Sequence, residues 1–194
     1  MDKHTLVDAV LSENGFVFGG YVRDMLTGAT PRDIDCYVPP ENFMSLISRL
    51  MVLGSVTLTR KPDTYGGVGT VMVALEGVDI PLEVTDQEVH VAIPCDFTVN
   101  MLILNKKGIG VSPALENRIP LQRILRDLER RECWGEFWAP RSESHRDFLV
   151  KYAKVRTQKM LDKGYKLTRP IEVDNVRTRD EYQDLDAYGF YTND

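Results

Sequence analysis

The stretch FVFGGYVRDMLTGATPRDID, residues 16–35, contains a glycine pair, an Arg-Asp pair and two aspartates separated by one residue. Glycine permits backbone angles and close approaches that a β-carbon forbids, so a strand that reaches Gly19-Gly20 can turn sharply into a helix. The N–H groups at the start of such a helix bind phosphate. The segment DIDCYV is typical of a strand, in which side chains two residues apart share a face. The carboxylates of Asp33 and Asp35 are therefore expected to project into the same space. Paired carboxylates hold Mg²⁺ together with substrate phosphates.

Each of these features alone is common in proteins. A glycine pair is most often a turn, and two alternating aspartates are most often a solvated surface pair. Their order along one segment is more informative, because strand, turn, helix, loop and strand follow one another directly. A phosphate-binding turn followed by a two-carboxylate metal site predicts nucleotide chemistry.

The composition is that of an ordinary globular protein. A chain of 194 residues suits one or two small domains, and its hydrophobic content of 43% is sufficient for a core. The N-terminal segment carries acids and has no apolar core, so we expect no secretory signal. The longest apolar runs are too short to span a bilayer, which predicts no membrane partner. Three widely spaced cysteines indicate reduced thiols in a cytoplasmic protein, without a zinc site.

The charge is distributed unevenly along the chain. Residues 1–105 hold 6 Lys and Arg against 14 Asp and Glu, residues 106–170 hold 16 against 8, and residues 171–194 hold 2 against 7. A run of charge is usually a solvated helix face. A basic block that directly follows a metal-site domain is nevertheless where a phosphate-bearing substrate would be held, so we expect an RNA acceptor to contact the 106–170 region.

Three ordered segments resemble one known family. GGYVRDMLTG…RDID is similar to the signature of the class II tRNA nucleotidyltransferase (CCA-adding enzyme) and bacterial poly(A) polymerase head domain, in the polymerase-β-like superfamily. GVGTVMVALEGVDIPLEVT (67–85) resembles the family's strand pair with a third carboxylate. DFTVN (96–100) resembles the motif that follows it, although Pro94 and Cys95 stand where the family usually has two arginines. The resemblance covers roughly residues 16–105.

The resemblance implies an α+β fold, a polymerase-β-like nucleotidyltransferase head with a mixed sheet flanked by helices, followed by a short helical neck. We expect the head at residues 1–112, a basic neck-like region at 113–170 and an acidic C-terminal tail at 171–194. Helical spacing predicts helices at 42–53, 121–131 and 146–161. It also favours a helix at 97–104, and a strand is expected at 79–85.

The resemblance also implies a reaction, in which an acceptor hydroxyl attacks the α-phosphate of an NTP such as ATP and pyrophosphate leaves. Two metal ions, Mg²⁺ or Mn²⁺, can clamp the attacking and leaving oxygens of such a displacement. Asp33 and Asp35 are the expected metal ligands, and Glu83 is the expected third catalytic acid, with Asp79 as the fallback. The implied nucleotide-binding residues are Gly19, Gly20, Arg23, Asp24, Arg32, Asp96 and Asn100.

Several of these roles have structural alternatives. Arg23 could pair with phosphate or form a structural ion pair with Asp24, since its planar fork suits both. Asp96 and Asn100 are spaced to share a helical face, and Asp96 could equally be the N-cap of that helix.

The segment 146–165 resembles the family's base-selecting helix only in its closing pattern, which includes Arg156. We therefore also consider a catalytically degenerate binding or regulatory module, and an enzyme that modifies a protein or a small molecule. The sequence leaves the oligomeric state open.

Overall fold

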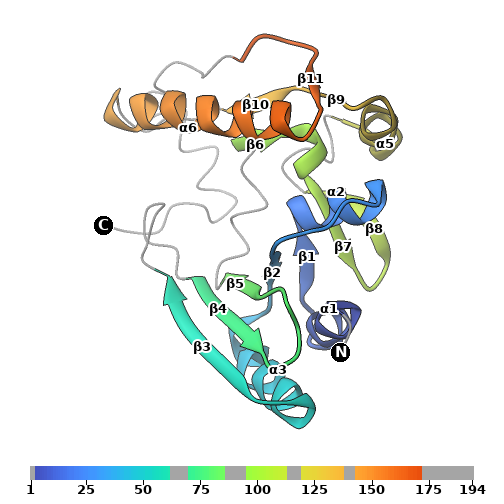
Figure 1. Ribbon diagram of the computed structural model, residues 1–194, viewed down its shortest axis with the longest axis vertical. Coiled ribbons are helices and arrows are strands. Elements are labelled where there is room, and N and C mark those ends of the chain that lie inside the picture. Colours follow the sequence, from blue (N-terminus) through green and yellow to red (C-terminus); the bar gives the residue numbers. More distant parts are fainter. Residues whose placement is uncertain (1–2, 62–69, 86–94, 113–118, 138–142, 172–194) are drawn as a thin grey trace.

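The computed structural model describes residues 3–61, 70–85, 95–112, 119–137 and 143–171. Its centre is a seven-stranded mixed sheet with the strand order β3-β4-β5-β2-β1-β7-β8 (Figure 1). These strands are β1 Phe16–Phe18, β2 Ile34–Tyr37, β3 Val56–Lys61, β4 Thr70–Leu75, β5 Leu82–Thr85, β7 Leu102–Asn105 and β8 Gly108–Val111. All neighbouring strands in this sheet are antiparallel except β2 and β5, which are parallel.

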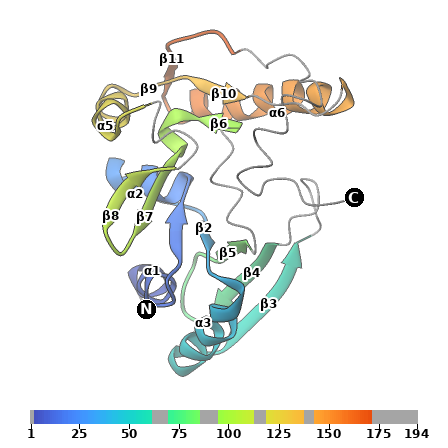
Figure 2. The ribbon, with the colours of Figure 1, turned by 180° about the vertical axis from the view of Figure 1, so that it is seen from behind.

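The two faces of the sheet differ in how deeply their side chains are buried. Helices α1 Lys3–Ser12 and α3 Pro40–Leu53 contact each other and bury Leu6, Val10 and Leu50 in the core (Figures 1 and 2). Along β2 the side chains alternate, so that Ile34 and Cys36 are fully buried while Asp35 and Tyr37 remain partly exposed. We call the side of Ile34 and Cys36 the core face and the side of Asp35 and Tyr37 the open face.

The glycine pair makes the turn that the sequence predicts. Strand β1 ends at Phe18, and helix α2, Gly20–Thr27, begins two residues later. Gly19 has φ 74° and ψ −138°, a conformation that L side chains rarely adopt. The helix ends at Gly28, which has φ 68° and donates backbone hydrogen bonds to the last turn.

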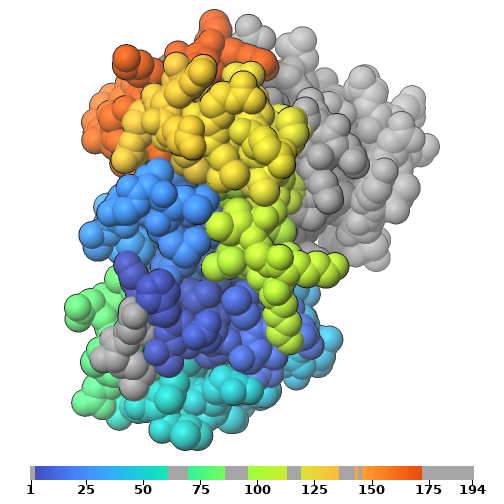
Figure 3. Space-filling model, turned by 90° about the vertical axis from the view of Figure 1, so that its right-hand side faces the viewer, coloured from blue at the N-terminus to red at the C-terminus, as the bar shows by residue number. Residues whose placement is uncertain are grey.

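The C-terminal part of the chain adds helices α5 Leu121–Arg130 and α6 Glu143–Asp162 with two short sheets. One pairs β6 Cys95–Phe97 with β10 Gly135–Phe137, and the other pairs β9 Glu132–Cys133 with β11 Lys166–Leu167. Figure 3 shows this part, coloured yellow to orange, stacked above the N-terminal part. The pairing of β6 with β10 means that residues before and after the proposed boundary at 112 share one ladder.

Two sequence expectations about this fold are wrong, and one strand was not expected. Residues 97–104 are not a helix, because a 3₁₀ turn at Thr98–Asn100 leads into β7, which pairs with both β1 and β8. The strand expected at 79–85 begins only at Leu82, because Pro81 cannot donate to a strand ladder. The edge strand β3 was not foreseen, although Val56 and Leu58 alternate with Thr57 and Thr59, because the alternating run is short and most of its described side chains are exposed.

The predicted helices at 42–53, 121–131 and 146–161 are confirmed within a few residues at their ends. Most of the predicted acidic tail, residues 172–194, lies outside the described residues. Within the described ranges, no helix is both long enough and apolar enough to cross a membrane.

The bend between α1 and β1 depends on Gly15. A Cβ at this position would lie 2.9 Å from the carbonyl oxygen of Val10 and closer still to that of Tyr37. We predict that Gly15→Ala lowers the free energy of unfolding by about 1–3 kcal/mol, since backbone atoms must move to admit the methyl group. Denaturant unfolding measures this loss.

Gly110→Ala is the matched control for that substitution. Its added Cβ would meet Ile103 at 3.6 Å, an ordinary contact, so stability should change by less than about 1 kcal/mol. An equal effect of the two substitutions would contradict this explanation of Gly15.

Candidate functional site

The parallel pairing of β2 with β5 brings the expected carboxylates together. Asp35 and Glu83 are register partners in this pair, so their side chains share the open face. Both are partly exposed. Asp33 lies just before β2, two residues from Asp35, and is also partly exposed. The structure therefore places Asp35 and Glu83 side by side on the open face, with Asp33 two residues before Asp35.

The pKa of the Cys36 thiol, on the opposite face of β2, is affected by these acids. Cys36 is fully buried on the core face, and burial raises the pKa of its thiol. The negative charges of Asp35 and Glu83 raise the pKa of Cys36 further, as expected for carboxylates close to one another and to the sulfur.

The fallback acid does not join the site. Asp79 is exposed in the segment that follows the turn at Gly77, ahead of β5. The backbone N–H of Ile34 donates to the carbonyl oxygen of Pro81 at 3.0 Å, which fixes where pairing between the strands begins. Asp79 precedes this point and does not belong to the strand that holds Glu83.

The glycine pair lies directly beside the acids. A Cβ at Gly19 would lie 3.3 Å from Oδ2 of Asp35, so only a residue without a side chain leaves this space open. The N–H of Gly19 donates to the carbonyl oxygen of Leu102 at 3.1 Å, which ties the turn to β7. The first turn of α2 has no acidic residue and no side-chain cap, a feature that suits an anion at this helix start.

Arg23 and Asp24 form a buried ion pair. Their side chains are 5% and 7% exposed, and Nε of Arg23 donates to Oδ1 of Asp24 at 2.7 Å. Nη1 of Arg23 also donates to Oδ1 of Asn100. The sequence left open whether Arg23 binds phosphate or forms a structural ion pair with Asp24, and these contacts are those of the structural ion pair. Arg32, by contrast, is exposed in the segment before β2.

Asp96 lies in β6 and receives four hydrogen bonds from described residues. Asn100 donates to Oδ2 at 3.1 Å, and the backbone N–H of Phe97 donates to Oδ1 at 2.7 Å. Arg156 donates with Nε to Oδ1 at 3.2 Å and with Nη2 to Oδ2. The predicted contact between Asp96 and Asn100 is therefore present, but across a 3₁₀ turn. The alternative role of Asp96 as a helix N-cap is wrong, because Phe97 occupies that position.

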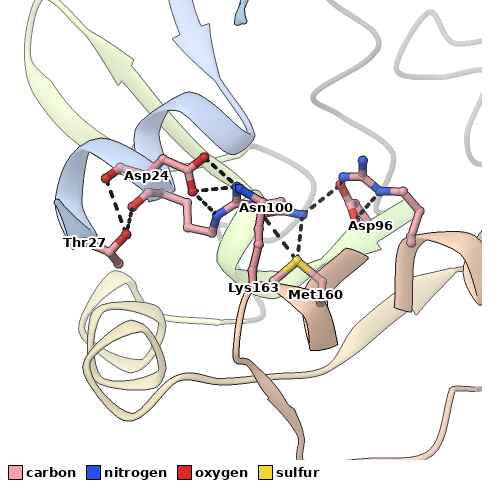
Figure 4. Close-up of polar contacts among 8 residues, drawn as sticks. Asp24, Thr27, Asp96, Asn100, Met160 and Lys163 are labelled. Atoms are coloured by element: carbon pink, nitrogen blue, oxygen red, sulfur yellow. Dashed lines mark hydrogen bonds and ion pairs between the residues drawn. The ribbon is translucent and has the colours of Figure 1, made fainter. Parts of the chain in front are cut away.

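Helix α6 and the residue that follows it contribute three contacts that sequence reasoning missed. Lys163 forms an ion pair with Oδ2 of Asp24 at 3.0 Å, Arg156 binds Asp96, and Sδ of Met160 lies 3.9 Å from Nη1 of Arg23. Arg156 and Met160 in α6 and Lys163, which directly follows its end, are spaced i, i+4 and i+7, the spacing of one helix face, and that was the available signal. Figure 4 shows how they meet the residues from α2, β6 and the 3₁₀ turn. We call this set the α6 cluster: Arg23, Asp24, Asp96, Asn100, Arg156, Met160 and Lys163.

Electrostatics connect the α6 cluster to the carboxylates. Burial lowers the pKa of Arg156, but the charges of Asp96 and Tyr152 and the hydrogen bond with Asp96 together outweigh this effect and raise the pKa above its ordinary value. Asp35 contributes to the same increase. The guanidinium of Arg156 therefore lies within electrostatic reach of the open face.

We predict that Asp24→Asn lowers the free energy of unfolding by about 3 kcal/mol, because it leaves the buried Arg23 guanidinium without its carboxylate. Gln158→Ala is the control, since it removes only an exposed hydrogen bond to Asp162 on α6. It should change stability by less than about 0.5 kcal/mol. Denaturant titration of both variants decides, and a loss in Asp24→Asn as small as in the control would refute a stabilising role for the pair.

Comparison with known proteins gives similarity in structure only. The sequence matches no family model and no curated protein. A CCA-adding enzyme in apo form I superposes with a TM-score of 0.52 at 18% identity, covering 85% of this chain and 38% of that chain. A tRNA-processing enzyme in apo form I gives 0.51 at 18% identity, covering 84% and 42%. The same kind of enzyme in its complex 3 gives 0.51 at 20% identity, covering 84% and 43%.

The chain thus spans less than half the length of these structures. At such identities the similarity establishes the fold, and the expected fold class is confirmed. The chain has a mixed sheet flanked by helices, as in the nucleotidyltransferase head of CCA-adding enzymes.

Proposed function

We propose that this protein is a metal-dependent, template-independent nucleotidyltransferase. It transfers NMP from an NTP to an acceptor hydroxyl and releases pyrophosphate, and the acceptor is an RNA 3′ end. The observation that carries the proposal is the register of Asp35 with Glu83 on the open face, beside a glycine that leaves the space next to Asp35 free. The shared fold supports the same reaction class.

The donor set fits a hard divalent cation. Asp33, Asp35 and Glu83 offer only carboxylate oxygens, the ligands that Mg²⁺ and Mn²⁺ prefer. Among the described residues no group of three or more His, Cys, Asp or Glu side chains is placed to hold a metal ion by itself. Mg²⁺ does not need such a group, because it usually keeps water ligands and uses one or two carboxylates with substrate phosphates. When bound, such ions neutralise phosphate charge and lower the pKa of the attacking hydroxyl.

Each residue of the proposed site has a distinct role in the reaction. Asp33 and Asp35 hold the cation, and Glu83 orients the acceptor hydroxyl. Gly19 and Gly20 admit the triphosphate to the start of α2, where backbone N–H groups and the helix dipole favour negative charge. Arg23 and Asp24 support this turn from below as a positioning pair.

An RNA acceptor is supported by exposed cations in the proposed neck-like region. They lie on two helices: Arg123, Arg126 and Arg130 on α5, and Lys151, Lys154 and Lys159 on α6. Exposed cations attract a phosphate backbone regardless of its sequence. The division of the chain into a head (1–112), a neck-like region (113–170) and a tail (171–194) remains a proposal, and the pairing of β6 with β10 joins residues on both sides of its first boundary.

We predict that purified protein with Mg²⁺ or Mn²⁺ and labelled NTPs labels RNA 3′ ends. Asp35→Asn and Glu83→Gln should each slow labelling by about 100-fold or more, the scale of losing one electrostatic group in a catalytic site. Asp79→Asn is the matched control, since Asp79 is exposed and outside the strand, and it should label at the wild-type rate.

Labelling that survives in Asp33→Ala/Asp35→Ala would refute the proposed site. Wild-type protein that neither labels any acceptor nor binds NTP with metal would instead support the binding or regulatory module. The hydrogen bonds from Arg156 to Asp96 favour that second candidate, because they occupy a carboxylate that was expected to bind the nucleotide.

We also predict that Lys151→Ala/Lys154→Ala/Lys159→Ala weakens RNA binding and makes it less sensitive to salt. The slope of log affinity against log salt should fall by about 2, since each lost contact with a single strand contributes about 0.7. Fluorescence anisotropy over a range of salt concentrations measures the slope. An unchanged slope would exclude these lysines from the RNA contact.

A further inference from the structure

A strip of aromatic and apolar side chains lies on the open face, where the core does not cover it. Phe16 and Phe18 alternate with the fully buried Val17 on β1, and Tyr37 follows the fully buried Cys36 on β2. On β7, Ile103 pairs with Phe18 and alternates with Leu104, which packs against the core. All four side chains are partly exposed. We call Phe16, Phe18, Tyr37 and Ile103 the aromatic strip.

The rings of this strip lie close together. Phe16 and Tyr37 are register partners, with ring centroids 5.2 Å apart and planes inclined by 34°. The rings of Phe16 and Phe18 are 6.0 Å apart. Three rings on two adjacent strands therefore form one continuous apolar surface.

The strip continues directly from the carboxylates. Tyr37 lies two residues beyond Asp35 on β2 and shares its face. Phe18 is followed by Gly19, whose absent Cβ would approach Oδ2 of Asp35. A ligand that reaches the acids can therefore extend along the strip.

Strand β8, next to β7, places only glycines on the open face. Its residues Ile109 and Val111 pack against the core, so the alternate residues Gly108 and Gly110 occupy the open face. Gly110 pairs with Ile103 and Gly108 pairs with Asn105. Glycine has no side chain, so no side chain of Gly108 or Gly110 lies beside the strip to hinder a flat group.

We propose that the aromatic strip binds unpaired bases at the 3′ end of the acceptor RNA by stacking. Aromatic side chains on a sheet stack bases with little regard to sequence, because every base has a π face. The charges also favour this occupant. Asp35 and Glu83 disfavour phosphate against the strip itself, whereas the exposed Lys107 in the β7–β8 turn offers a cation at its far end, next to Lys106, which donates to Oδ1 of Asn14 at 2.8 Å. This inference rests on the proposed function, since it names the part of the acceptor that lies next to the acids.

The test compares two short single-stranded RNAs that end in an unextendable 3′-deoxy nucleotide. One carries all its bases, and the other is abasic at its last three positions, with the same phosphates. Anisotropy without NTP should show that wild-type protein binds the complete RNA about tenfold more tightly than the abasic RNA, or better. This arm needs no variant and no catalysis, so it gives a result even if NMP transfer is never observed.

Phe16→Leu/Tyr37→Leu should bring the affinity ratio close to one while affinity for the abasic RNA stays unchanged. Phe43→Leu is the matched control, because Phe43 packs against the core from α3, away from the open face. Its ratio should remain that of the wild type. Thermal unfolding of each variant verifies that it is folded.

Two results would overturn the inference. One is a wild-type ratio near one, which would leave the bases without a role in binding. The other is a ratio that persists in folded Phe16→Leu/Tyr37→Leu. If that variant instead converts a wild-type dimer into a monomer with the ratio unchanged, the strip is a contact between copies of this chain.

Discussion

The parallel pairing of β2 with β5 is the constraint on which the candidate site depends. Side chains alternate along a strand, so a slip of one residue in this register would move Asp35 and Glu83 to opposite faces. The hydrogen bond from Ile34 to Pro81 and the burial of Ile34, Cys36, Leu82 and Val84 on the core face fix the register. The apolar core therefore decides where the acids lie, although none of its side chains belongs to the site.

The α6 cluster is a second constraint, and it acts through directional polar contacts. Burying ion pairs such as Arg23–Asp24 removes both charges from water, and such pairs often add little net stability. Their geometry is more specific than apolar packing, because each hydrogen bond has a defined direction and length. Asp24 and Asp96 on one side, with Lys163 and Arg156 on the other, hold α6 in one position relative to the sheet. The lysines on α6 then have a fixed relation to the open face.

Local sequence signals predicted the parts of this fold that local physics determines. The turn at Gly19 and the strand beginning at Ile34 were predicted because glycine and alternating residues carry that information by themselves. The segment 97–104 was predicted wrongly, since a short apolar run suits a buried strand and a helix equally, and pairing with β1 and β8 decided between them. The role of Arg156 escaped prediction for a related reason. Its partner Asp96 is 60 residues away, and only the assembled fold brings the two together.

The central claim is that Asp33, Asp35 and Glu83 form a cation site that an NTP completes. Titration of Mn²⁺, followed by the relaxation of water protons, tests it most directly when done with and without a non-hydrolysable NTP. The account predicts that the NTP tightens Mn²⁺ binding to the wild-type protein, and that Asp35→Asn abolishes this effect while Asp79→Asn preserves it. Equal Mn²⁺ binding by the wild type and Asp35→Asn in the presence of the NTP would contradict the account.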